Sequence, residues 1–124
     1  MNALAAADWA LVNGRVLAAL GPVLIVTGIV GFFTPPRLAL MSGAPAYNVF
    51  HIVFGIIGTA LVLAKSARGV AAFNLAFGAA DLYQAVAGIG GFFPARQFRY
   101  KPADHVVHIV LGLGLVAVGW MGLR

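Results

Sequence analysis

The sequence of 124 residues contains no cysteine. A disulfide, a thiolate nucleophile, an iron–sulfur cluster and a cysteine-ligated zinc site are therefore excluded within it. Charged side chains are also scarce, because they make up only 9% of the chain and just three of them are acidic. A soluble domain of this length has too much surface to cover with so few charges.

Long apolar runs take the place of those charges. Hydrophobic residues form 62% of the chain, its mean hydropathy is +0.99, and most charges lie between four apolar stretches. Each stretch is long enough to cross ~30 Å of hydrocarbon at 1.5 Å per residue, or nearly so for the second. We therefore expect an all-α fold, a membrane four-helix bundle that forms a single integral membrane domain over residues 1–124. The expected spans are about Val16–Phe33, Val49–Ala64, Gly69–Phe93 and Asp104–Leu123.

The segment before the first span predicts a short interfacial helix over Ala3–Val12, with Trp9 at headgroup level. Four spans return the chain to its starting side, where Trp120 is expected as well. Within the first span, Pro22 removes a backbone donor and predicts a kink.

The formal net charge of +5 does not indicate a nucleic-acid partner, because the basic residues form no stripe and sit near the ends of the spans. We interpret them as contacts to anionic lipid headgroups. Their distribution leaves the orientation open, since four lie on each side of the membrane. The side of the termini carries Arg15, Lys65, Arg68 and Arg124, and the opposite side carries Arg37, Arg96, Arg99 and Lys101.

Two sequence blocks occur twice. Gly28–Phe33 returns as Gly88–Phe93, an offset of 60 residues, and His51–Gly55 returns as His108–Gly112, an offset of 57. Because each copy holds two spans, both copies enter the membrane from the same side, which predicts two parallel two-helix repeats related by an axis along the membrane normal. The repeats extend over about 14–64 and 69–123.

Small residues and histidines share helix faces in this pattern. His51 lies four residues before Gly55, and His108 lies four residues before Gly112. Glycine stripes let helix backbones approach closely in lipid. We therefore expect both imidazoles to point into the bundle, at the same depth.

The two equivalent histidines support two interpretations. Inward imidazoles at one depth suit a bis-histidine haem b, or a chlorophyll-type pigment bound by one of them. Alternatively, both are structural residues in a capped first turn, where Asn48 and Asp104 accept backbone N–H bonds and the imidazoles bond across helices or to water.

A second possible site lies at the start of the last span. Asp104, His105 and His108 fall close together and could hold a zinc ion with a fourth ligand or water. The alternative is that His105 sits at the water boundary with its ring hydrated.

Asp81 is the one acid at the centre of a span. Its charge is costly there, so it is expected to face the interior or to carry a proton. Counted at 1.5 Å per residue, Asp81 lies about 18 Å from the loop and His108 about 6 Å, so a direct bond between them is not expected. Thr59 reaches about 16 Å and is the better partner, and Tyr83 and Gln84 could extend the network. Asp81 could couple a proton or a cation to transport, or could be a packing device or a contact to another subunit.

The pair of histidine-led helices resembles a bacterial family of four-helix membrane proteins known as domain of unknown function 4383. The motifs that carry the resemblance are Asn48–His51 with Gly55 and Asp104–His108 with Gly112. The resemblance covers about residues 16–120 and implies a four-span protein of the bacterial inner membrane, without implying an activity. In the family pattern asparagine usually follows the acid of the second motif, where this chain has His105.

Our leading functional prediction is a small non-enzymatic membrane protein without a cofactor. It would be an accessory or structural subunit that contacts lipid and other membrane subunits or a second copy of itself. The alternatives are a tetrapyrrole-binding or electron-transfer subunit that uses His51 and His108, and a small proton-coupled transporter that uses Asp81.

Overall fold

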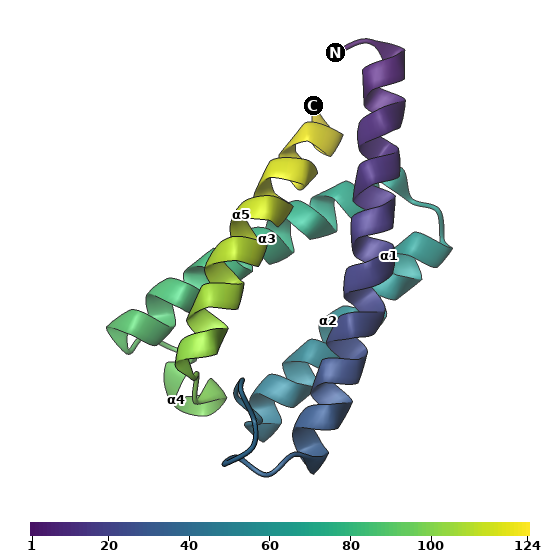
Figure 1. Cartoon of the computed structure of the whole chain (residues 1–124). Helices are drawn as coiled ribbons and strands as arrows, with labels where there is room; N and C mark the ends of the chain where they lie inside the picture. Colours follow the sequence, from purple (N-terminus) through teal and green to yellow (C-terminus); the bar gives the residue numbers. More distant parts are fainter.

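The computed structural model describes residues 1–124 and contains helices and no strand (Figure 1). Four helices are long and apolar enough to cross a membrane, which confirms the all-α prediction with four candidate spans. The fifth, α4, is a single turn between α3 and α5. The helices are α1 (Ala3–Phe33), α2 (Pro45–Leu63), α3 (Ala67–Gly90), α4 (Ala95–Phe98) and α5 (Pro102–Leu123).

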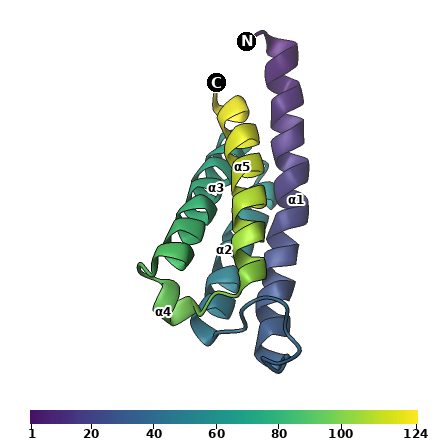
Figure 2. The ribbon, with the colours of Figure 1, turned by 60° about the vertical axis from the view of Figure 1, so that its left-hand side comes forward.

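The prediction of a separate interfacial helix before the first span is wrong. α1 is one continuous helix of 31 residues that starts at Ala3 and passes through Pro22 (Figure 2). The cause lies in the alanine-rich start, which favours helix, and in Asn2, whose side chain accepts a hydrogen bond of 2.9 Å from the backbone N–H of Ala5. At the end of α3, Gly91 adopts a left-handed φ of 76°, which stops this helix before the expected Phe93.

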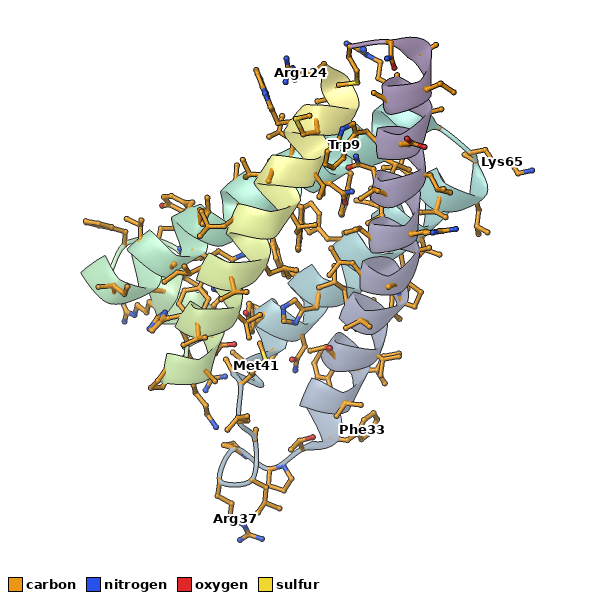
Figure 3. All side chains as sticks on the ribbon, turned by 45° about the horizontal axis from the view of Figure 1, so that its top comes forward. Trp9, Phe33, Arg37, Met41, Lys65 and Arg124 are labelled. Carbon is orange, nitrogen blue, oxygen red and sulfur yellow. The ribbon has the colours of Figure 1, made fainter.

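The four long helices form two hairpins. α1 packs mainly on α2, and α3 packs mainly on α5, while α1 also touches α3 and α5. The two chain termini lie at the same end of the molecule (Figures 1 and 2). Figure 3 shows Trp9, Lys65 and Arg124 toward that end and Arg37 at the opposite one. A chain that crosses a membrane an even number of times must have both termini on the same side.

Glycines form the contact inside each hairpin, as the sequence predicts. A Cβ placed on Gly55 would lie 2.7 Å from the backbone oxygen of Gly21 on α1. In the second hairpin, a Cβ on Gly78 would lie 2.7 Å from the backbone nitrogen of Val116 and 2.9 Å from the oxygen of Gly112. Larger side chains at these positions would force the backbones apart.

The apolar core lies along α1 and α3, and α3 is the most buried of the spans. Its buried members come from three helices, namely Leu17, Leu20, Leu24, Val70, Phe73, Phe77 and Leu115. The outer faces of all four spans carry exposed valine, isoleucine, leucine and aromatic side chains. Such a surface suits lipid or the apolar face of a neighbouring protein.

The two linkers on the side opposite the termini are tied together. The ammonium of Lys101, just before α5, donates hydrogen bonds of 2.6 Å to the backbone oxygens of Pro36 and Ala39 in the linker between α1 and α2. In the same linker, the backbone N–H of Ser42 donates to Asp104 of α5 at 2.9 Å. We call this set of contacts the linker clasp.

Candidate functional site

A buried tyrosine joins the two hairpins beneath the linker clasp. Tyr47 in the first turn of α2 has no exposed surface, and its hydroxyl lies 2.6 Å from Nε2 of His108 on α5. Its ring centroid is 4.1 Å from that of His51, which lies one turn further along α2. Phe98 and Tyr100 pack on the same ring at 5.1 and 5.5 Å. Tyr47 is not among the residues predicted from the sequence, although its spacing of four residues from His51 places both on one helix face.

Both histidines point inward, as predicted. His51 is 6% exposed and His108 is 3% exposed, and each Nδ1 is buried without a hydrogen-bond partner. The bond between His108 and Tyr47 crosses from α5 to α2, which agrees with the structural interpretation for this histidine.

The residues around the two imidazoles do not fit a haem held between them. The ring of Tyr47 lies against both imidazoles, and its hydroxyl is hydrogen-bonded to Nε2 of His108. The adjoining cavity is about 140 Å³, whereas pockets for larger organic ligands measure roughly 300–1,000 Å³. The tetrapyrrole interpretation stays a prediction, and this packing disfavours it.

The side chains at the start of α5 do not come together as a metal site. No group of three histidine or acidic side chains in the chain is placed to hold a metal ion. Asp104 instead caps α5, because one of its carboxylate oxygens accepts hydrogen bonds from the backbone N–H groups of Ser42 and Lys101. His105 packs near Tyr100, with ring centroids 6.0 Å apart.

The capping role expected of Asn48 is wrong. α2 begins at Pro45, earlier than predicted, and Ala44 precedes it without a side-chain cap. The amide of Asn48 donates a hydrogen bond of 2.9 Å to the backbone oxygen of Gly43, and its side chain packs over Gly31 of α1. Asn48 therefore holds the end of the linker, at Gly43, against α1.

Asp81 belongs to a short chain of polar side chains. Gln84 donates a hydrogen bond of 3.3 Å to Oδ1 of Asp81, and the hydroxyl of Tyr100 donates one of 3.0 Å to the amide oxygen of Gln84. Burial, followed by the charge of Asp104, raises the pKa of Tyr100, so this hydroxyl keeps the proton that it donates. The predicted participation of Gln84 is confirmed. The predicted participation of Tyr83 is wrong, because its hydroxyl donates to the backbone oxygen of Phe93 at an exposed position.

Thr59 is not the partner of Asp81. Its hydroxyl has no hydrogen-bond partner and lies against Gly21 in the contact between α1 and α2. Asp81 and His108 also lie closer in depth than the spacing along the chain predicts, because α3 and α5 pack in a different register. His105 lies against Gly88, so Asp81 and His108 are seven and three residues from that level, a difference of about 6 Å at 1.5 Å per residue. As expected, no hydrogen bond joins them, and Oδ2 of Asp81 has no partner.

Asp81 and both histidines line one small cavity of about 140 Å³ inside the bundle, which we call the central cavity. All four spans contribute to it, together with the linker between α1 and α2. Its polar lining consists of Thr27, Tyr47, His51, Asp81 and His108, and its other lining residues are Leu20, Val23, Leu24, Met41, Phe77, Val107 and Leu111. Met41 lies on the inner part of the linker (Figure 3).

A second buried polar cluster lies near the termini. The amide of Asn74 on α3 donates a hydrogen bond of 2.9 Å to the side-chain oxygen of Asn13 on α1. Asn13 in turn donates one of 2.7 Å to the backbone oxygen of Val118 on α5. These bonds tie three helices together, and Asn13 is not among the residues predicted from the sequence.

Comparison of the chain with family models, with curated proteins and with solved structures finds no match. The resemblance to domain of unknown function 4383 therefore stays a prediction that rests on the two histidine motifs.

Proposed function

We propose that the protein is a non-enzymatic accessory or structural subunit of a larger complex in the bacterial inner membrane. The observation that carries this proposal is an apolar groove of about 470 Å³ formed by α2, α3 and α4 with the adjoining chain after α3. Aromatic side chains dominate its wall, among them Phe50, Tyr83, Phe93 and Phe98. A groove of this kind on the outer face suits a helix side chain of a neighbouring subunit.

Internal duplication supports a packing role for most of the chain. Gly28 on α1 lies against Asn48 and Ile52 of α2, and Gly88 on α3 lies against His105 of α5. Gly28 corresponds to Gly88 at the offset of 60, and Asn48 corresponds to His105 at the offset of 57. We interpret the chain as two copies of a glycine-packed hairpin.

The proposal is tested by photo-crosslinking in native membranes. A benzophenone amino acid replaces Phe93 in the groove, and a matched variant carries it at Leu63 on the far end of α2. The two side chains are similarly exposed, at 74% and 77%, so they differ in location rather than in accessibility. We expect a discrete protein adduct from position 93 and only lipid adducts from position 63, with the adduct identified by mass spectrometry.

Lipid adducts alone at both positions, together with a monomeric mass in mild detergent, would contradict the proposal. An adduct of twice the mass of the chain would identify the partner as a second copy.

Two alternative functions depend on residues inside the helix bundle. A tetrapyrrole-binding or electron-transfer subunit is supported by the common burial of His51 and His108. An absorption spectrum without a Soret band, recorded on protein from its native host, would exclude this function.

A small proton-coupled transporter is supported by the placement of Asp81 on the central cavity. Unchanged transport in Asp81→Asn would exclude this function.

A further inference from the structure

Asp81 has no cationic side chain to balance its charge. It is 2% exposed and lines the central cavity, but none of the lysines and arginines of the chain lines it. Only one of its oxygens is hydrogen-bonded, at 3.3 Å to the neutral amide of Gln84. An ionised carboxylate within a membrane bundle is costly without a counter-charge, and the chain places no lysine or arginine in this cavity to supply one.

The polar lining of the central cavity is rich in acceptors. Besides the carboxylate of Asp81, it includes the imidazole of His51, whose neutral ring always has one acceptor nitrogen, and the hydroxyl oxygen of Thr27. Nδ1 of His51 and Oδ2 of Asp81 are both buried without a partner. A group that donates several hydrogen bonds and carries a positive charge would complement this lining.

The remaining walls limit the size and chemistry of the ligand. An apolar cavity of roughly 150 Å³ accommodates a molecule of the size of benzene, so about 140 Å³ admits a ligand of a few heavy atoms. Leucine side chains from α1 and α5 suit a short alkyl chain, and the rings of Tyr47 and Phe77 can face a cation.

We propose that the central cavity binds a small primary ammonium ion, with its alkyl chain against the leucines and its N–H groups directed to Asp81, His51 and Thr27. Met41 belongs to the lining and also to the linker between α1 and α2, so the cavity extends to the linker side of the bundle, from which a water-soluble amine can enter. The site is independent of the accessory role proposed above.

The test is isothermal titration calorimetry of the full-length protein in nanodiscs with n-propylammonium chloride. We expect saturable binding, and an affinity that rises from methylammonium to propylammonium and falls once the alkyl chain exceeds the cavity. Tetramethylammonium, which has no N–H donor, and sodium chloride should give no such binding. The variant Asp81→Asn should bind propylammonium at least tenfold more weakly, while Asp8→Asn, which changes an exposed acid on α1, should bind it like the wild type.

A second measurement on the wild-type chain needs no folded variant. In protein labelled with ¹⁵N-histidine, propylammonium should shift the ring signals of His51 and leave those of His105 unchanged. No heat and no shift with any amine would overturn the proposal, as would tighter binding of sodium than of propylammonium or equal binding by Asp81→Asn.

Discussion

At the scale of single residues, the hydroxyl of Tyr47 connects α2 to α5 through His108, and both side chains are buried. Interhelical hydrogen bonds within membrane bundles contribute about 0.6 kcal/mol on average, but a buried polar group left without a partner costs about 1–3 kcal/mol. Removing one partner of this pair is therefore expected to cost more than the bond itself contributes.

The substitution Tyr47→Phe keeps the ring and removes the hydroxyl, so Nε2 of His108 loses its partner. We expect a loss of about 1–2 kcal/mol in the free energy of unfolding, measured by SDS titration in mixed micelles with circular dichroism. Tyr83→Phe is the matched control, because the hydroxyl of Tyr83 donates to the backbone oxygen of Phe93 at an exposed position. Equal losses in both variants would argue against a special role for the buried pair.

The sequence predicted the direction of both histidines, because His51 and His108 share a helix face with glycines that must lie in the contact. It could not predict the partner of His108, which is 61 residues away on another helix. The assignment of Thr59 to Asp81 failed for the same reason, since the relative register of two helices depends on packing that the spacing along one helix does not contain.

At the scale of the helices, the positions of the glycines determine which helix faces pack against each other. A Cβ at Gly78 on α3 would lie 2.8 Å from the Cβ of Leu115 and 2.7 Å from the backbone nitrogen of Val116 on α5. Gly114, on α5 itself, has no neighbour within 4 Å of such an atom. The two positions therefore separate the effect of the helix contact from the effect of helix propensity.

We expect Gly78→Ala to lower the free energy of unfolding by about 1–3 kcal/mol, because the added methyl group collides with backbone atoms that cannot move without shifting α5. Gly114→Ala should be neutral or stabilising by about 0.5–1 kcal/mol, since alanine favours helix over glycine. The same SDS titration measures both. A neutral Gly78→Ala would show that α3 and α5 approach less closely than described.

Helix existence followed from composition, whereas helix ends did not. The apolar runs identified all four spans, but the break expected between a helix over Ala3–Val12 and the span from Val16 is absent, because α1 runs continuously from Ala3. Hydropathy marks where a helix can enter lipid, and α1 continues beyond that point because its alanine-rich start favours helix regardless of the solvent.

At the scale of the whole molecule, four crossings fix which loops share a side. The turn between α2 and α3 and the carboxyl terminus lie on one side, and the linker between α1 and α2 lies on the other. The charge count leaves the absolute orientation open, because four basic residues lie on each side.

The absence of cysteine makes this topology directly measurable. We expect Arg68→Cys and Arg124→Cys to react with a membrane-impermeant maleimide from the same side of the membrane, and Arg37→Cys to react only from the opposite side. Intact spheroplasts and inverted vesicles expose the two sides in turn, and the unsubstituted chain, which has no thiol, is the blank. Labelling of positions 68 and 124 from opposite sides would exclude four crossings.

The linker clasp also determines how this face would be recognised from outside. Because Lys101 holds Pro36 and Ala39, two segments more than sixty residues apart form one continuous patch. An antibody selected against the folded protein on this side should therefore bind a discontinuous epitope. It would label the native protein in membranes and fail on a denaturing blot.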